Sequence, residues 1–391
     1  MTQLGGAGGA GGAGGAGGAG GAGGAGGAGG AGGAGGSVLG TLGDVYANPV
    51  MVDALIHSRE GTIVVPENPT SPHFRYYAPP LPTTIDDVTQ MDRWEPWVRA
   101  YIAIGEMMRG IDFQTSGNAF QVRSFVSGPT SSSLIAEIQR PAQTTFEQQI
   151  PLVLSWAELR NERATEILAQ IDPQYAFWSS IIYLHPDRTR RTFELINMVL
   201  QFCVYVEMRF KHALGCYRPV EYNAQVQPMI TTPGHGTFPM GHGANTYAVC
   251  YVLRQLLQLD AWPRLRRVIG QLDRVSARIT TNRVIAGVHF PVDSMAGRML
   301  GVALGEYFVG RCTGNPTFMN RTFVAVGGID SYPTTDFNPF NTGPSTSTIP
   351  SQNLSLGPLY SESAGATVTQ SPLMYYLWAK AQAEWTGQFG L

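Results

Sequence analysis

Three short blocks of sequence, each next to a helix boundary, constrain this 391-residue chain more than any other feature. They read KHALGCYRP at residues 211–219, PMGH at 239–242 and NRVIAGVHFPVD at 282–293. Glycine and proline end or begin helices, and apolar residues at helical spacing flank the blocks. We therefore expect packed helices whose ends bring the three blocks to one place.

The blocks gather three permanent cations, Lys211, Arg218 and Arg283, and two imidazoles, His242 and His289. Cations that lie among Gly, Pro, Phe, Cys and Val residues are more typical of a buried site than of a solvated surface. A buried cation needs a partner, and both arginine's planar fork and lysine's point charge suit phosphate-like oxygens. The pattern indicates a pocket for a tetrahedral oxyanion, with ordinary surface charges as the alternative.

The blocks resemble the signature KxxxxxxRP, PSGH and SRxxxxxHxxxD. This signature is typical of the superfamily of type 2 phosphatidic acid phosphatases, bacterial acid phosphatases and vanadium-dependent haloperoxidases. Each block alone is a weak pattern, but all three in order at the family's spacing are specific. The resemblance implies an all-α fold, a helical bundle of the haloperoxidase and acid phosphatase type with irregular wrapping segments at both ends. The matching residues are Lys211, Arg218, Pro219, Pro239, Gly241, His242, Arg283, His289 and Asp293.

Two positions depart from this signature. Met240 replaces the serine of PSGH, and Asn282 replaces the serine before the arginine. Asn282 can still donate a hydrogen bond, whereas a thioether is only a weak acceptor. One donor to the bound oxyanion is therefore missing at Met240, and the backbone amide of Gly241 remains. The change indicates either a retuned pocket or a site with weak activity.

The resemblance also implies roles. His289 would bond to vanadium or attack phosphorus, and Asp293 would hold its other ring nitrogen. His242 would be the general acid or base. The implied catalytic residues are His242, His289, Lys211 and His235. The implied cofactor-binding residues are Lys211, Arg218, Met240, Gly241, His242, Arg283 and His289.

His235 lies seven residues before His242, where algal bromoperoxidases of this superfamily also carry a histidine and fungal chloroperoxidases a phenylalanine. The comparison implies that His235 tunes halide oxidation and that bromide is preferred to chloride. The alternative is a solvent-exposed loop histidine among glycines.

Three functions stay open on this basis. The first is a vanadate-dependent haloperoxidase that uses hydrogen peroxide, a halide and an organic acceptor, with Lys211 polarising the peroxide. The second is an acid phosphatase or phosphotransferase acting on a phosphate ester through a phosphohistidine, because phosphate can occupy the vanadate site. The third is a non-catalytic anion-binding or assembly protein.

The composition limits the partners and the location that we expect for a protein with such a site. The net charge of −2 gives no basic surface for nucleic acid. No run reaches the roughly 18 apolar residues of a membrane span, since charged and polar residues interrupt 193–210. The first residues, MTQL, show no secretory signal, and the four cysteines show no metal-ligand spacing. The sequence predicts a soluble, cytoplasmic protein with reduced, buried thiols.

Four regions follow from the pattern. Residues 1–36 hold a Gly-Gly-Ala tail, a flexible tether rather than a packed assembly, and 37–90 form a proline-rich irregular wrap. Residues 91–310 form the helical catalytic domain, and 311–391 an irregular segment that ends in a short helix. The aromatics of that last helix would dock on the body or on a second copy of the chain. The expected helices are 92–108, 151–168, 188–214, 243–259, 265–280, 291–309 and 372–385, with a possible strand at 120–126.

Overall fold

The computed structural model describes residues 49–62, 80–125, 132–171, 174–314, 318–339 and 359–391. The Gly-Gly-Ala tail and its predicted tether role lie outside the described residues. The chain divides at Ala100, and residues 100–391 form one compact unit. The part before Ala100 contains helix α4 (Pro49–Thr62) and the 3-10 turn η2 (Val88–Arg93), and α5 (Pro96–Arg109) crosses the division.

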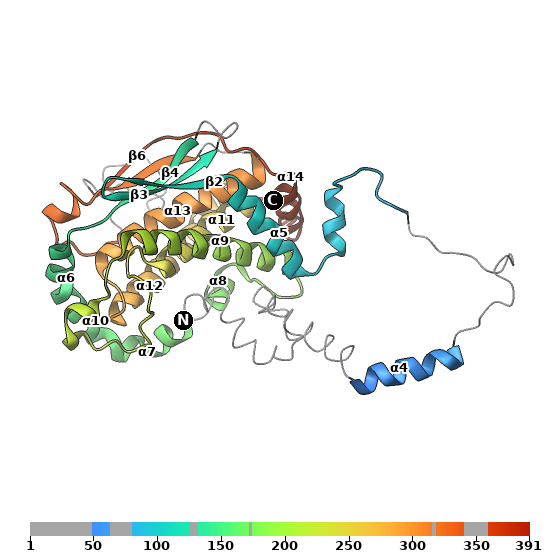
Figure 1. Cartoon of the computed structure of the whole chain (residues 1–391), viewed down its shortest axis with the longest axis horizontal. Coiled ribbons are helices and arrows are strands. Elements are labelled where there is room, and N and C mark those ends of the chain that lie inside the picture. The colour runs from blue at the N-terminus through green and yellow to red at the C-terminus, as the bar shows by residue number, and fades with distance from the viewer. Residues whose placement is uncertain (1–48, 63–79, 126–131, 172–173, 315–317, 340–358) are drawn as a thin grey trace. The chain divides into compact units, whose positions relative to one another are not determined.

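The compact unit contains a five-stranded mixed sheet, so the expectation of an all-α fold is wrong. The strand order is β2-β3-β4-β5-β6, with β4 and β5 parallel and the other neighbours antiparallel. The sheet lies on one side of the helices (Figure 1), where β3 contacts α9 and both β4 and β5 contact α13. The strands are β2 (Ile111–Ser116), β3 (Ala119–Phe125), β4 (Ser132–Gln139), β5 (Met319–Phe323) and β6 (Tyr360–Ala364).

The expected strand at 120–126 is present as β3, where buried and half-buried residues alternate as in a strand with one face on the core. β5 and β6 come from the region expected to be irregular. They join the edge of the hairpin sheet through β4, which pairs Ala136 with Arg321.

The helices form the body beneath the sheet. They are α6 (Gln143–Trp156), α7 (Arg160–Ala169), α8 (Tyr175–Ile182), α9 (Arg190–Leu214), α10 (Pro219–Tyr222), α11 (Gly241–Leu256), α12 (Arg266–Ile285), α13 (Pro291–Thr313) and α14 (Pro372–Ala383). Short 3-10 turns occur at Ala157–Leu159, Ala224–Val226, Leu259–Ala261, Pro263–Leu265 and Ile329–Ser331.

Helix α11 is the centre of this body, because it packs on α9, α12 and α13. Almost all of its residues are buried, which confirms the prediction of a central helix apolar on nearly every side. Gly301 and Gly305 of α13 face α11 so closely that a Cβ at either would press on backbone atoms of Ala244 or Ala248. The two helices therefore approach nearly backbone to backbone.

Two expected helix boundaries differ from the structure. Pro151 does not start a helix but lies inside α6, and α7 follows as a separate helix. α12 does not end near Thr280 but continues to Ile285, so Arg283 lies in its last turn. A helix tolerates proline when the lost hydrogen bond is replaced or not needed, which sequence pattern alone does not reveal.

The C-terminal helix starts as predicted, with the Ser371 hydroxyl accepting from the amide of Met374 at 3.4 Å. α14 packs on α9 and α13, with Trp378 buried. Just beyond it, the Glu384 carboxylate accepts from the amides of Arg191 and Thr192 at 2.7 and 2.9 Å at the start of α9.

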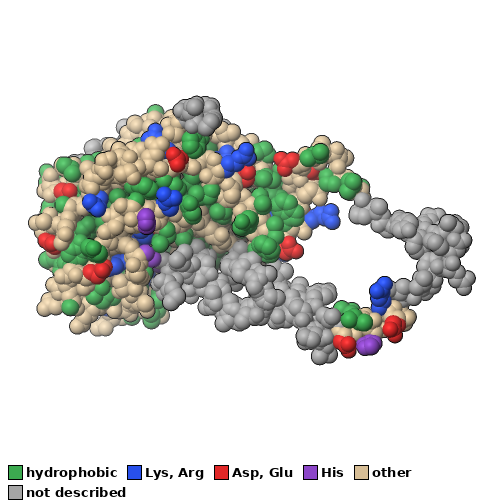
Figure 2. Space-filling view, in the orientation of Figure 1, with side chains coloured by type: hydrophobic (Ala, Val, Ile, Leu, Met, Phe, Trp, Pro, Cys, Tyr) green, Lys and Arg blue, Asp and Glu red, His purple; other side chains and the backbone are tan. Residues whose placement is uncertain are grey.

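The four cysteines are buried and unpaired. Within the described part of the chain, none of the helices is both long and apolar enough to cross a bilayer. On the face in Figure 2, acidic and basic side chains are interspersed, and neither sign forms a continuous patch.

Candidate functional site

Helix ends deliver the three blocks to one region. α9 ends with Lys211 in its last turn, because Gly215 takes a left-handed conformation with φ of 57° and Pro219 starts the next helix. Arg218 immediately precedes α10, and His242 is the second residue of α11. Arg283 lies in the last turn of α12, while His289 lies just before α13.

Four of these side chains line one pocket: Arg218, His242, Arg283 and His289. The rest of its wall is mostly apolar and comprises Ile171, Ile230, Thr231, Pro233 and Val288. All four charged or titratable side chains are at least nine-tenths buried. The pocket therefore combines two guanidinium groups and two imidazoles with an apolar wall, and none of the described residues that line it carries a carboxylate.

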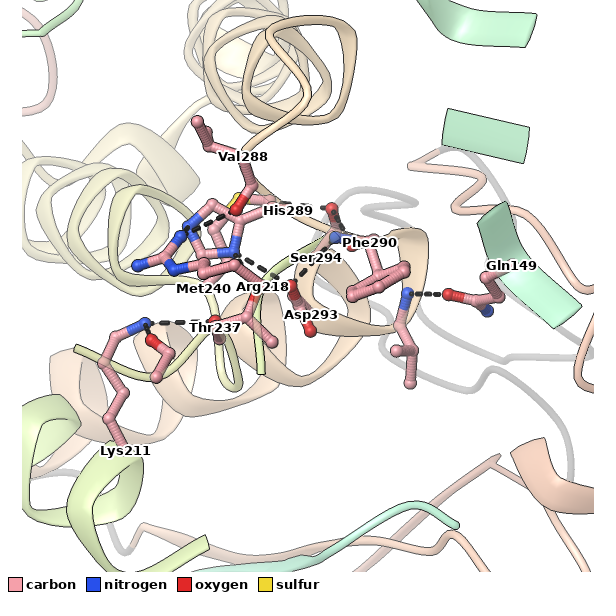
Figure 3. A network of polar contacts seen from close by, with 12 residues as sticks. Gln149, Lys211, Arg218, Thr237, Met240, Val288, His289, Phe290, Asp293 and Ser294 are labelled. Carbon is pink, nitrogen blue, oxygen red and sulfur yellow. Dashed lines mark hydrogen bonds and ion pairs between the residues drawn. The ribbon is translucent and has the colours of Figure 1, made fainter. Parts of the chain in front are cut away.

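His289 is held from both ring nitrogens. Its Nδ1 lies 2.9 Å from Oδ2 of Asp293, and its Nε2 lies 3.0 Å from Nη1 of Arg218 (Figure 3). A carboxylate only accepts and a guanidinium only donates, so Nδ1 carries the proton and Nε2 holds the lone pair. The basic nitrogen of His289 therefore lies on the Arg218 side, where the pocket is.

Asp293 itself is fixed by further donors. Its Oδ2 also accepts from the amide of Phe290 at 2.9 Å and from the hydroxyl of Thr237. Thr237 is fully buried in the loop before PMGH, and no family pattern singled it out. It is one of the residues that sequence reasoning missed.

Arg283 has N–H groups for which the described part of the chain offers no partner. Its Nη2 donates to the carbonyl of Ile167 at 2.9 Å and lies 3.4 Å from Oε1 of Gln170. Its Nε and Nη1 are buried, and neither has a hydrogen-bond partner among the described residues. A buried guanidinium left in this state is costly, so an anionic partner is expected at the pocket.

Gln170, another residue that the sequence did not indicate, contacts the pocket residues His242 and Arg283 and also Asn282. Its carbonyl accepts from Nε2 of His242 at 2.9 Å, and its side-chain oxygen accepts from Asn282 at 2.9 Å and faces Arg283. Asn282 therefore points to Gln170 rather than to a pocket anion. Nε2 of His242 carries a proton, which leaves Nδ1 as the basic nitrogen of the neutral ring.

Lys211 does not line the pocket. Its Nζ donates to the carbonyls of Gly236 and Thr237, both at 3.1 Å (Figure 3). It is nevertheless 98% shielded, with a relative exposure of 2%. Lys211 thus fixes the loop that carries Thr237 and contributes its charge from behind that loop.

The remaining predicted residues surround this arrangement. Met240 is fully buried and turns toward α13, where Oγ of Ser294 lies 4.0 Å from its sulfur. Gly241 is in such close contact with Glu207 of α9 that a Cβ there would collide with its carboxylate. His235 is half-buried rather than exposed, and its Nδ1 lies 3.2 Å from Nη2 of Arg218.

Burial and the cations keep the imidazoles neutral. Burial, helped by Arg283, lowers the pKa of His242 to about 3. Burial, Arg218 and Lys211 lower the pKa of His289 well below its usual value. A bound anion would act in the opposite direction and raise both pKa values.

Residues 193–311 match the family model of the PAP2 superfamily. This segment contains all three blocks, and the match confirms that it is a PAP2 domain, the superfamily that the sequence signature indicated. The superfamily includes both phosphatases and haloperoxidases. No curated protein sequence matches the chain closely enough to count as a relative.

Proposed function

We propose that the chain is a vanadate-dependent haloperoxidase whose pocket binds the oxyanion between Arg218, Arg283 and His289. The observation that carries the proposal is the buried guanidinium of Arg283, whose Nε and Nη1 have no partner among the described residues and which lines the same pocket as two neutral imidazoles. A tetrahedral oxyanion would satisfy these donors and supply the missing negative charge.

The residues present fit vanadate. Arg218 and Arg283 would donate to its oxygens, and His289 would contribute the lone pair of Nε2, which Arg218 contacts at 3.0 Å. Vanadate supplies a Lewis acid that polarises hydrogen peroxide without a change in its own oxidation state. The apolar wall of Ile171, Ile230 and Val288 would limit water around the anion.

The protein's own contribution is proton handling. His242 is neutral because its pKa is lowered to about 3, so it can take a proton from hydrogen peroxide. Asp293 keeps the proton of His289 on Nδ1. In the whole reaction, bromide takes one oxygen from peroxide, and one proton is consumed to give hypobromous acid and water.

A phosphatase is the second candidate, favoured by the lone pair on Nε2 of His289, which lies on the pocket side beside Arg218. Nε2 would form a bond to phosphorus while the ester P–O bond breaks, and water would later release phosphate. His242 would then have to protonate the leaving oxygen. Burial and Arg283 lower the pKa of His242 in the free pocket, and a bound anion would raise it, so this pKa does not separate the two functions and the assays below are needed to do so.

Purified protein saturated with orthovanadate should brominate a phenol-type dye when hydrogen peroxide and bromide are added. The same preparation, free of vanadate, should be tested for hydrolysis of p-nitrophenyl phosphate. Bromination that needs vanadate and disappears in His289→Ala supports the haloperoxidase. Ester hydrolysis without bromination supports the phosphatase, and binding of neither oxyanion supports a non-catalytic protein.

A further inference from the structure

Glu207 is a buried carboxylate that nothing in the mechanism uses. It lies on α9, four residues before Lys211, and is fully shielded from solvent. Both of its oxygens lack a hydrogen-bond partner among the described residues. A buried carboxylate without a partner is costly and calls for a proton or a ligand.

Glu207 is not explained as the counter-ion of Lys211. These residues share a helix face at a spacing of four, where an ion pair would be easy to form. Nζ of Lys211 instead donates to the carbonyls of Gly236 and Thr237, at 3.1 Å each. Among the described residues, no salt bridge joins Glu207 to a cation.

Glu207 is not among the residues that line the pocket, but its carboxyl group faces the start of α11, which carries the lining residue His242. It presses on the α-carbon of Gly241, where any side chain would collide with it. The next residue, His242, lines the pocket, and the first amides of a helix have no intrahelical acceptor. The pocket residue Arg218 is also close enough that the charges of Glu207 and Arg218 shift each other's pKa.

We propose that Glu207 is a ligand-binding residue of the oxyanion pocket, and that its carboxyl group and the bound anion share one proton. The shared proton makes an O–H···O hydrogen bond between Glu207 and one anion oxygen. Glu207 thereby supplies a donor from α9 at the end of α11 where Met240 offers none. This inference rests on the proposed oxyanion site and names a further residue of it.

The pKa values of the titratable groups around Glu207 set the pH range of the test. Burial raises the pKa of Glu207 to about 7, against the effects of Lys211 and Arg218, and burial lowers the pKa of Lys211 to about 7. Cys203, on the same helix, has its pKa raised by burial and by Glu207. Among the other groups in and around the pocket, the pKa values are about 3 for His235 and His242, well below 6.5 for His289, and about 6 for Asp293.

Sulfate is the appropriate probe, because it carries no proton in this range. The Kd for sulfate should be measured between pH 7.5 and 9 by calorimetry at constant ionic strength. Wild-type affinity should fall as both Glu207 and Lys211 lose protons. Gln is a neutral donor of nearly the same shape as a protonated Glu. In Glu207→Gln, the factor by which Kd rises per pH unit should therefore be about ten times smaller than in the wild type.

Proton uptake gives a second readout. Sulfate binding at pH 8 should take up about one proton fewer in Glu207→Gln than in the wild type. The matched control is Glu194→Gln, a buried glutamate of α9 that pairs with Arg191 at 3.0 Å. It should keep the wild-type proton uptake.

The outcomes separate the two proposals. If Glu207→Gln folds with a wild-type melting profile and binds sulfate with the same pH dependence and proton uptake, Glu207 is not a ligand-binding residue. If the wild type binds neither sulfate nor vanadate, the oxyanion site itself is wrong and this inference falls with it.

Discussion

Oδ2 of Asp293 lies 2.9 Å from Nδ1 of His289, and the relative exposures of the two side chains are 0% and 1%. The same oxygen receives the amide of Phe290 and the hydroxyl of Thr237. One carboxylate oxygen therefore fixes both the turn into α13 and the protonation of the imidazole. The lone pair of His289 therefore lies on the other ring nitrogen, Nε2, beside Arg218.

Asp293→Asn should weaken vanadate binding by about 10- to 100-fold, the usual effect of losing such a partner. The amide has nearly the shape of the carboxylate, but its NH₂ group favours a proton on Nε2 and removes the lone pair from the pocket side. The measurement is vanadate titration followed by ⁵¹V NMR, together with a melting curve.

The control for this variant is Asp330→Asn. Asp330 accepts from the amide of Ala142 at 3.0 Å at the start of α6 and is not part of the pocket. It should lose stability without losing vanadate affinity. Equal losses of affinity in both variants would mean that the effect of Asp293 is general destabilisation.

Arg283→Met should raise the stability of the free protein while greatly weakening oxyanion binding. The change removes a buried cation whose Nε and Nη1 have no partner within the described ranges, and fills the space with an apolar chain. Replacement of buried charge by apolar groups is often stabilising, by about 1–4 kcal/mol. Urea unfolding without ligand and vanadate titration measure the two effects.

The control is Arg278→Met, five residues earlier in α12, where the half-exposed Arg278 pairs with Glu166 at 2.7 Å. It should change stability by less than about 1 kcal/mol and leave binding intact. If Arg283→Met binds vanadate as tightly as the wild type, Arg283 does not hold the anion.

The sequence alone could predict the PAP2 domain and the helices that carry it. Helices α9, α11 and α13 could be predicted because each contains a long apolar stretch. Gly215 marks the end of α9, and Pro291 marks the beginning of α13. The three blocks pointed to Arg218, His242, Arg283 and His289, which the structure brings to one pocket.

The sheet could not be predicted, because its strands are short and two of them lie far along the chain. One edge of β4 pairs with β5, where Ala136 lies opposite Arg321. The local sequence pattern does not encode a contact between residues so far apart in the chain. Gln170, Thr237 and Glu207 were missed for the same reason. Each has an ordinary local sequence and reaches the site only through packing of helices or of the 236–237 loop.

Acidification should destabilise the protein through His242. Its pKa is lowered to about 3 in the folded protein, so only the unfolded chain takes up a proton as pH falls below about 6.5. The stability is therefore complete above pH 6.5 and is lost toward low pH. Between pH 7 and 5 the loss from this residue is about 2 kcal/mol.

Urea unfolding at pH 7 and pH 5 checks this effect in His242→Gln, whose amide can still donate to Gln170. The variant should lose about 2 kcal/mol less on acidification than the wild type. The raised pKa values of Glu207 and Asp293 act in the opposite direction in both proteins, so they cancel in the comparison. His212→Gln, an exposed imidazole of α9, should behave as the wild type. An unchanged pH response in His242→Gln would show that His242 is not the neutral group described.

Met240→Ser should tighten vanadate binding and lower stability at the same time. A hydroxyl at this position adds a hydrogen-bond donor at the start of α11, and a bond to a charged oxygen contributes about 1.5–3 kcal/mol. The removed side chain is fully buried beside Ser294, so the cavity should cost about 2–5 kcal/mol, as for other large-to-small core changes. Vanadate titration and urea unfolding separate the two effects, and Met299→Ser, a buried methionine farther along α13, controls for lost volume without the new donor. If Met240→Ser weakens vanadate binding while Met299→Ser does not, the thioether itself supports the pocket and the missing-donor account of Met240 is wrong.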